Sequence, residues 1–405
     1  MDKKTKLFCF FVIFWVIAQI ICLIFYWNVN QTFDSFYYIP QARYHAELGM
    51  PYPTVHNLFD KYLQSPGYIN MLAISFALTG SYKPILIIGI LMNLGILLNI
   101  YYLTKTLFDR ATAILASIIY CIIPTNVFIP IWLTTELPYV FLGITALNLS
   151  FRHNVKILVF AGFIYALAQT IRPIVIAFLI CSLVFFLIHH YSFRKYLAII
   201  VPYVLLLFFN GLYVKKQTGY FVTSSTVAGY DLMYTSYDGA NGGQHPWYVF
   251  NVDGPGYIEN ESHVDFVKKD SIWKHRSIDW IKDHPMRYLG LCIKRPFIMY
   301  KSDIWDIPFL MRNTSSATFR FIEKLLVNIP YYLVLILAII SLFIGLRHYI
   351  SEKGIPFLYL VLGTGATCLF GMEVRYHYPY VFVLAIMAAF CIMLIQNKFL
   401  KSKQI

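Results

Sequence analysis

Long apolar runs recur along the whole chain and are separated by short polar breaks. Only 13% of the 405 residues are charged, against about 25% in a typical soluble domain. A transmembrane helix needs roughly 20 apolar residues in succession, so this pattern predicts an all-α polytopic membrane protein. About ten spans are expected, at residues 7–27, 84–104, 111–128, 136–150, 155–171, 173–189, 196–213, 326–346, 355–370 and 378–396.

The distribution of Lys and Arg predicts the orientation of these spans. Segments on the side of both termini hold 14 of the 33 basic residues, and the short segments on the opposite side hold 5. The other 14 lie in segment 214–325, which is not counted because long loops cross membranes largely regardless of charge. Both termini are therefore expected in the cytoplasm. The net charge of +13 then reflects membrane orientation, and no nucleic-acid partner is expected.

The polar breaks divide the chain into three parts. Residues 1–213 form an N-terminal transmembrane module with a first outer loop at 28–83, residues 214–325 an exoplasmic loop domain, and residues 326–405 the C-terminal transmembrane helices. Run 7–27 ends in aromatic residues without a cleavage site, which is typical of an uncleaved anchor. Short membrane-surface or re-entrant helices are expected at 40–48 and 67–79. In 214–325 we expect loop up to about residue 260 and a basic interfacial helix over 286–300.

Five acids outside the long segment are expected on the outer face, close to the membrane: Asp34, Glu47, Asp60, Glu136 and Glu373. Ionisable groups at that depth are costly and usually serve function. Six of the seven cysteines lie inside apolar runs and none forms a CxxC pair, so neither a disulfide framework nor a zinc site is expected. The chemistry is therefore expected on the outer face, carried by acids and arginines.

Five short motifs follow one another in a fixed order and share this predicted side. They are Phe33-Asp34-Ser35-Phe36-Tyr37, Leu133-Thr134-Thr135-Glu136-Leu137, Gln169-Thr170-Ile171-Arg172-Pro173, the long-loop pair Tyr234–Gly239 and Ile281–Leu289, and Glu373-Val374-Arg375-Tyr376-His377. Together they resemble the GT-C glycosyltransferases, and within them the bacterial relatives of dolichyl-phosphate-mannose protein mannosyltransferases. The resemblance covers roughly residues 1–395.

The resemblance implies a polyprenyl-phosphate sugar as donor, a lipid, glycan or protein as acceptor, and membrane lipids as surroundings. Such a transfer needs a base for the acceptor hydroxyl and positive charge on the leaving phosphate. We expect catalysis by Asp34 and Glu136. Donor phosphate binding is expected from Arg172, Arg375 and Lys294, and acceptor binding from Tyr37, Glu373, Tyr376 and His377. Ser35 stands where many relatives carry a second acid, so no cofactor is assigned and a divalent metal is left open.

Each assignment has a structural alternative. Asp34 could cap the following helix, and Glu136 could complement a helix dipole. Arg375 could pair with Glu373 or reach lipid headgroups, as Lys294 could. The alternative functions are a flippase or transporter of a lipid-linked sugar, and a polysaccharide polymerase or ligase. We expect a bacterial inner membrane, although the tail 401–405 also resembles an endoplasmic-reticulum retrieval signal.

Overall fold

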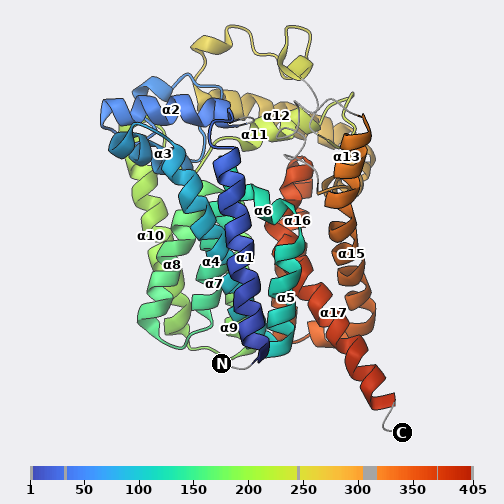
Figure 1. The fold of residues 1–405 in the computed structure, drawn as a ribbon. Coiled ribbons are helices and arrows are strands. Elements are labelled where there is room, and N and C mark those ends of the chain that lie inside the picture. Colours follow the sequence, from blue (N-terminus) through green and yellow to red (C-terminus); the bar gives the residue numbers. More distant parts are fainter. Residues whose placement is uncertain (1–2, 32–33, 244–246, 304–316, 372, 403–405) are drawn as a thin grey trace.

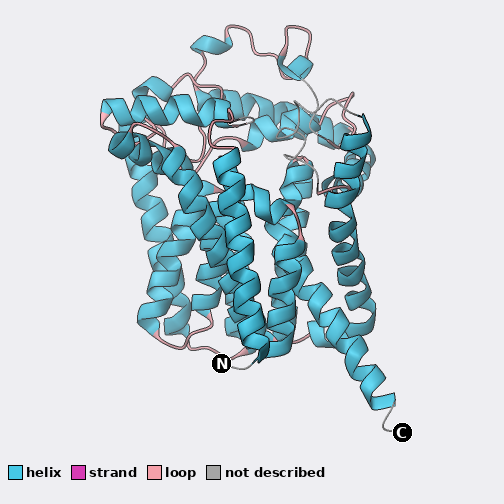
Figure 2. Ribbon diagram, viewed as in Figure 1, coloured by secondary structure: helices cyan, strands magenta, loops and turns pink. Residues whose placement is uncertain are grey.

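The computed structural model describes residues 3–31, 34–243, 247–303, 317–371 and 373–402, and within these ranges the chain is helical with no strand (Figure 2). The helices that run along the bundle are α1 (Lys3–Phe25), α4 (Lys83–Leu107), α5 (Arg110–Ile122), α7 (Glu136–Ser150), α8 (Val155–Ile171), α9 (Ile176–Ile188), α10 (Phe193–Thr218), α15 (Ala317–Tyr349), α16 (Ile355–Phe370) and α17 (Val381–Ser402), and the one-turn helix α6 (Thr125–Phe128) follows α5. The prediction of an all-α polytopic membrane fold is confirmed.

Fewer helices meet the length of a full span than the sequence pattern suggests. Among the described residues, six helices are long and apolar enough to cross a membrane, and a seventh is added if α5 and α6, bent by 76° at their junction, count as one broken span. The three other predicted spans form α7, α8 and α9, with 15, 17 and 13 residues. At 1.5 Å per residue these are only about 20–25 Å long, because Glu136 and the Arg172-Pro173 break limit them.

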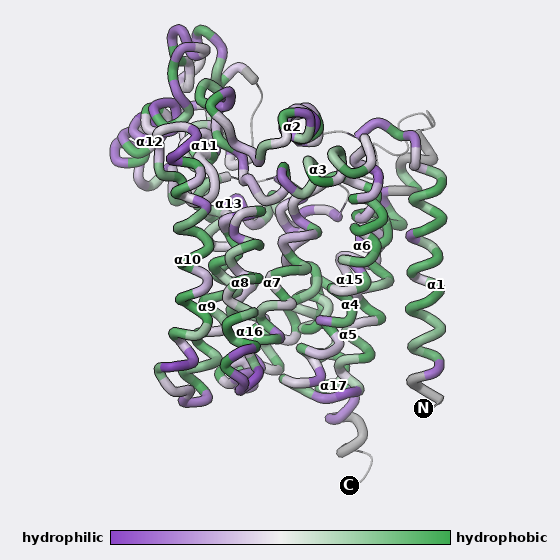
Figure 3. The backbone as a smooth tube through the Cα atoms, turned by 90° about the vertical axis from the view of Figure 1, so that its left-hand side faces the viewer, coloured by the Kyte–Doolittle hydropathy of each residue, from purple (hydrophilic) through white to green (hydrophobic). Residues whose placement is uncertain are grey.

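The last helix forms the centre of the bundle. Residues 378–391, in and just before α17, are all buried, and α17 packs mainly against α5 and α15. A helix that is apolar on every face can be buried on every side without leaving polar groups unsatisfied. In contrast, α1 lies at the edge of the bundle, where Leu7, Phe10 and Phe14 are each more than 60% exposed. Figure 3 shows that apolar residues also predominate along the other long helices, as expected for membrane-spanning segments.

Shorter helices lie across one end of the bundle (Figure 1). They are α2 (Ser35–Leu48), α3 (Pro66–Thr79), α11 (Ala228–Thr235), α12 (Phe266–Asp283) and α13 (Pro285–Met299). We call this end the site end, and the opposite end, where α1 begins and α17 ends, the terminal end. Gly67 brings α3 close to α8, since a Cβ atom there would lie 2.3 Å from Thr170 Oγ1. The predicted helices 40–48, 67–79 and 286–300 correspond to α2, α3 and α13.

The prediction of loop structure up to residue 260 is wrong for α11. Leu232 and Met233 are buried, and α11 packs along α12. The stretch has glycine, tyrosine and polar residues of weak helix propensity, and tertiary packing overrides that propensity. This difference matters because α11 faces the region that contains the predicted site residues.

Candidate active site

An acid from the beginning of the chain pairs with an arginine near its end. Asp34 occupies the N-cap position of α2 but makes no side-chain capping hydrogen bond. Its Oδ2 instead lies 3.0 Å from Nη1 of Arg375, whose Nε lies 2.7 Å from Oε2 of Glu373. The Arg375 side chain is 11% exposed, whereas Asp34 is 42% exposed. The guanidinium is thus enclosed between two carboxylates, and Asp34 is the one more open to solvent.

A second ion pair lies nearby and is more deeply buried. Glu136 begins α7 and Arg172 ends α8, and Oε1 of the acid lies 2.6 Å from Nη1 of the arginine. The Glu136 side chain is only 2% exposed. Pro173 stops α8 immediately after Arg172 and opens the short 3₁₀ helix before α9, which leaves the arginine at the site end of the bundle. Glu136 lies in the first turn of α7, where a carboxylate complements the helix dipole, and it also has Arg172 as a direct partner for its negative charge.

One aromatic ring connects the two pairs. The guanidinium carbons of Arg172 and Arg375 lie 5.2 Å and 5.6 Å from the centre of the Tyr376 ring, within the range of cation–π attraction. Burial raises the pKa of Glu373, the Asp34 and Glu136 carboxylates raise it further, and Arg375 opposes them. The two pairs therefore belong to one electrostatic group.

Sequence reasoning missed a further acid in this group. Burial raises the pKa of Asp231, on α11, to about 7; Arg172 and Arg375 lower it, and Asp34 and Glu373 raise it. Within the described residues its carboxylate makes no hydrogen bond or ion pair. The signal that could have revealed it is an acid flanked by Tyr230 and Leu232, a helical pattern that the polar composition of the segment concealed. We define the acid–arginine cluster as these seven residues: Asp34, Glu136, Arg172, Asp231, Glu373, Arg375 and Tyr376.

The unusual environment of Asp231 leads to a pH prediction. Because its pKa rises from 3.8 to about 7 on folding, the folded protein keeps a proton that the unfolded chain releases between these values, and stability should fall as pH rises through this window. We expect Asp231→Asn to be more stable than wild type at pH 8 by about 1–2 kcal/mol, and nearly equal to it at pH 4. Thermal unfolding in detergent at both pH values measures this. Asp253 is exposed, so Asp253→Asn should behave as wild type. If Asp231→Asn showed the same pH dependence of stability as wild type, the raised pKa of Asp231 would be contradicted.

Gly371 places the arginine segment against α11. It follows α16 with φ of +156°, and a Cβ atom there would lie 2.3 Å from Cγ2 of Thr235. Thr235 also donates a hydrogen bond to the carbonyl of Phe370. The 3₁₀ helix Val374–Tyr380, which carries Arg375 and Tyr376, begins just beyond this contact. A side chain at position 371 would separate Asp231 from the two arginines.

The hydroxyl of Tyr37 binds outside the acid–arginine cluster. Its hydroxyl donates to Oδ2 of Asp60 at 2.9 Å, and the same oxygen accepts from Asn57 at 3.0 Å. Lys269, on α12, donates to the main-chain carbonyls of Phe59 and Asp60 at 2.9 and 3.1 Å. This network fastens α2 to the loop that follows it and to α12. Because Tyr37 lies in the first turn of α2, three residues after Asp34, this network also helps to fix the position of Asp34.

His377 also lies outside the cluster. Its Nε2 is 2.8 Å from Oδ1 of Asp303, and both side chains are fully buried. Oδ2 of Asp303 accepts from the Thr125 hydroxyl of α6 at 2.5 Å. The contact joins the arginine-bearing 3₁₀ helix to α6 and to the chain after α13. The acceptor role expected for His377 stays a prediction, but its contacts are those of a residue that positions Arg375.

Lys294 is exposed on α13 and makes no contact with the cluster, whereas its neighbour Arg295 is fully buried. Arg295 donates to the carbonyls of Cys368 at 2.6 Å and Thr235 at 2.9 Å. It thereby joins the end of α16 to the end of α11, at the negative pole of both helices. The phosphate-binding role expected for Lys294 stays a prediction, and the contacts of Arg295 are those of a residue that links α11, α13 and α16.

The described residues do not offer a ready metal site. No group of three or more His, Cys, Asp or Glu side chains within them lies close enough together to hold a metal ion. In the acid–arginine cluster the carboxylates are opposed by guanidinium groups, which would compete with a cation. We therefore derive no step through a metal.

The bundle with short helices across one end shares its overall fold with a solved membrane-protein structure. No protein-family model and no curated protein matches the sequence. Among solved structures, the apo form of the Archaeoglobus fulgidus oligosaccharyltransferase matches with a TM-score of 0.51 and 12% identity, covering 95% of this chain and 50% of that one. The same protein in complex with Zn and sulfate gives 0.49 and 15%, with 95% and 49% covered. This chain spans about half the length of that protein, and identity this low shows the fold alone.

Proposed function

We propose that the protein is a membrane glycosyltransferase that moves a sugar from a polyprenyl-phosphate donor to an acceptor hydroxyl on the outer face. The observation that carries the proposal is the convergence of acids and arginines from five separate parts of the chain at one end of the bundle. Six charged side chains gather here, and two of them are buried, with Glu136 2% and Arg375 11% exposed. Such a grouping is costly, and a reaction that needs both a base and an anion-binding group gives a reason for it. The fold supports the class of enzyme, and the cluster supports the chemistry.

In the proposed reaction, the acceptor oxygen attacks the anomeric carbon of the sugar while the bond from that carbon to the phosphate oxygen breaks. The hydroxyl proton passes to Asp34, and the lipid leaves as polyprenyl phosphate. Arg375 and Arg172 compensate the negative charge that develops on the phosphate. Glu136 keeps Arg172 in place. Glu373 and Tyr376 line the same region and are the remaining candidates for acceptor contact.

The pairing of Asp34 with Arg375 suggests how the base becomes active. A carboxylate in an ion pair is a poor base, because the partner favours its ionised form. Arg375 has two carboxylate partners, and Asp34 is the more exposed of them. We propose that the donor phosphate replaces Asp34 on Arg375. Asp34 then gains proton affinity only when donor is bound, which couples proton transfer to occupancy of the site.

This exchange predicts a specific defect for Arg375→Lys. Lysine keeps the charge but cannot contact a carboxylate and a phosphate through a fixed planar fork. We expect the inhibition constant of free polyprenyl phosphate to rise by about tenfold, with a similar rise in KM for the donor. Arg287→Lys is the matched control, since Arg287 is an exposed arginine of α13 that pairs with Asp238. Unchanged polyprenyl-phosphate inhibition in Arg375→Lys would remove the arginine from the donor site.

The function itself is tested with membranes that contain the wild-type protein. A panel of polyprenyl-phosphate sugars is supplied with a mixed extract of cell-envelope acceptors, and release of polyprenyl phosphate is followed. Release from one donor supports the proposal and identifies the sugar. Movement of an intact lipid-linked sugar across the bilayer, without release, would favour the flippase alternative. A second panel supplies polyprenyl-diphosphate-linked glycans, and release of polyprenyl diphosphate from these donors alone would favour the polymerase or ligase alternative.

A further inference from the structure

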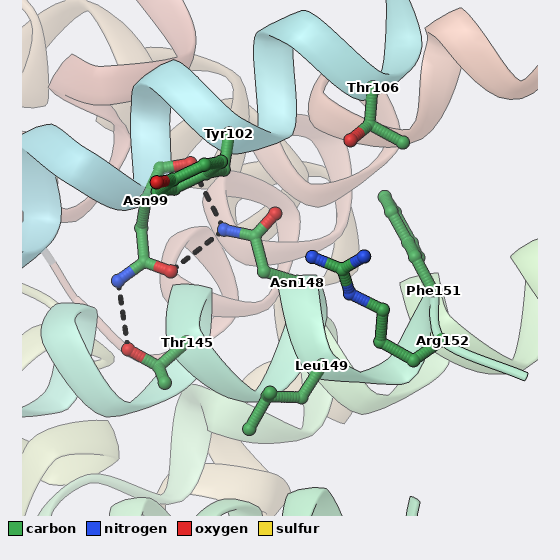
Figure 4. Close-up of a pocket in the computed structure, with 8 residues that line it drawn as sticks. All are labelled: Asn99, Tyr102, Thr106, Thr145, Asn148, Leu149, Phe151 and Arg152. Carbon is green, nitrogen blue, oxygen red and sulfur yellow. Dashed lines mark hydrogen bonds between the residues drawn. The ribbon is translucent and has the colours of Figure 1, made fainter. Parts of the chain in front are cut away.

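A polar pocket opens at the terminal end of the bundle, far from the acid–arginine cluster. It has a volume of about 210 Å³ and lies between the ends of α4 and α7. Asn99 and Thr106 line it from α4, Asn148 from α7, and Phe151 and Arg152 from the turn that follows α7 (Figure 4). None of these residues is fully buried. The pocket thus combines amide, hydroxyl and guanidinium groups at the membrane-facing edge of the bundle.

The amide groups form a partly satisfied network. Asn148 Nδ2 donates to Oδ1 of Asn99 at 2.8 Å and to the Asn99 carbonyl at 3.0 Å, and Asn99 Nδ2 donates to Thr145 Oγ1 at 3.0 Å. Within the described residues, Oδ1 of Asn148 accepts no hydrogen bond. A carboxamide oxygen facing lipid is costly when it has no donor. The pocket therefore keeps one acceptor available for a hydroxyl group of a ligand.

Arg152 supplies a cation with no protein partner. In the part of the chain that the structure describes, its guanidinium forms no ion pair, hydrogen bond or ring contact. The side chain points into the pocket on the side of the Asn148 carboxamide (Figure 4). Lys105 and Lys156 are exposed at the same end of the bundle and add positive charge around the opening. An unpaired guanidinium beside a spare acceptor matches a phosphate that carries a hydroxylated substituent.

We propose that this pocket binds the headgroup of an anionic phospholipid such as phosphatidylglycerol. Arg152 binds the phosphate, and the Asn148 carboxamide oxygen accepts a hydrogen bond from a glycerol hydroxyl. Leu98, the neighbour of Asn99 on α4, and Val155, three residues after Arg152, are exposed apolar residues that an acyl chain of such a lipid could contact. Basic pockets between transmembrane helices on the cytoplasmic side are known to take such headgroups, and the Lys and Arg distribution predicts that this end is cytoplasmic.

The size of the pocket favours a headgroup over a larger ligand. Sites for drug-sized molecules measure about 300–1,000 Å³, and this one measures about 210 Å³. A phosphate with its glycerol fits a space of this kind, whereas a lipid-linked oligosaccharide does not. The site is independent of the proposed glycosyl transfer, since none of its residues belongs to the acid–arginine cluster.

The test is lipid binding to the purified full chain by native mass spectrometry, with phosphatidylglycerol, phosphatidylcholine and inorganic phosphate as probes. Two variants perturb the pocket in different ways. Arg152→Gln removes the cation, and Thr106→Trp fills the pocket but keeps Arg152. Arg194→Gln is the matched control, because Arg194 is an exposed arginine at the same end and does not line the pocket. Both Arg152 and Thr106 are exposed, so neither change should prevent folding.

We expect wild type and Arg194→Gln to bind phosphatidylglycerol at least about tenfold more tightly than phosphatidylcholine, and both pocket variants to lose this preference. Loss in Arg152→Gln with normal binding in Thr106→Trp would overturn the pocket, since it would indicate attraction by surface charge alone. Competition by inorganic phosphate at concentrations equal to the lipid would overturn a lipid site in favour of a free-anion site. Equal binding of phosphatidylglycerol by wild type and all variants would overturn both the lipid site and the free-anion site.

Discussion

Asp34→Asn is expected to lower turnover by about 10²–10⁴-fold, the range that general-base catalysis usually contributes. Asparagine has nearly the same shape and cannot accept the acceptor proton. Donor affinity should be unchanged or slightly higher, because the phosphate no longer competes with the Asp34 carboxylate for Arg375. Release of polyprenyl phosphate gives turnover, and inhibition by free polyprenyl phosphate gives affinity. A loss of turnover with donor affinity retained indicates a base, whereas a loss of donor affinity indicates a residue that only positions Arg375.

A matched control lies on the same helix. Glu47 is an exposed acid of α2, and Glu47→Gln should retain wild-type turnover. Full turnover in Asp34→Asn would sink the base assignment and make Asp231 the next candidate, since its pKa of about 7 suits proton transfer at neutral pH. Weaker donor binding with normal turnover would instead mean that Asp34 acts only through Arg375.

Arg172→Met is expected to destabilise the protein by about 3–5 kcal/mol, because it leaves the Glu136 carboxylate buried without its partner. The double variant Glu136→Gln/Arg172→Met removes both charges and should recover most of that loss. Thermal unfolding in detergent of the wild type, both single variants and the double variant gives the coupling energy of the pair. A double variant as unstable as Arg172→Met would show that the arginine stabilises the fold through other contacts.

The chain contains a control for burial. His189 and Glu352 are also 2.6 Å apart, but both side chains are about 35% exposed. Exposed pairs contribute little, so Glu352→Gln should cost less than about 1 kcal/mol. Equal losses for the two pairs would mean that burial does not raise the cost of breaking the Glu136–Arg172 pair.

The membrane fold could be predicted from sequence with good accuracy. Helices α7 and α16 have the bounds expected from the apolar runs at 136–150 and 355–370, because polar residues or glycines stand at both ends of each run. Helix α11 could not be predicted in this way. Its stability comes from packing on α12, and a local pattern contains no information about that contact.

The candidate site could be predicted in part. Placing acids and arginines near one face identified Asp34, Glu136, Arg172, Glu373, Arg375 and Tyr376, which the structure brings together. The predicted side of the membrane does not tell where a side chain points. Tyr37 and His377 were therefore predicted in the same site, and the structure shows their side chains bound to Asp60 and Asp303. Asp231 was missed because its importance depends on burial beneath neighbouring groups and not on the residues beside it in the chain.

The two ion pairs differ in how far apart their members stand along the chain, and this sets an order of assembly during synthesis. Glu136 and Arg172 are joined through adjacent helices, α7 and α8, so their pair can form while the second half is still being made. Asp34 must wait for Arg375, which emerges just ahead of the final helix. The centre of the bundle, α17, is also added at that point. Insertion of segment 373–402 therefore completes the core of the bundle and the Asp34–Arg375 pair in one event, after the Glu136–Arg172 pair has formed.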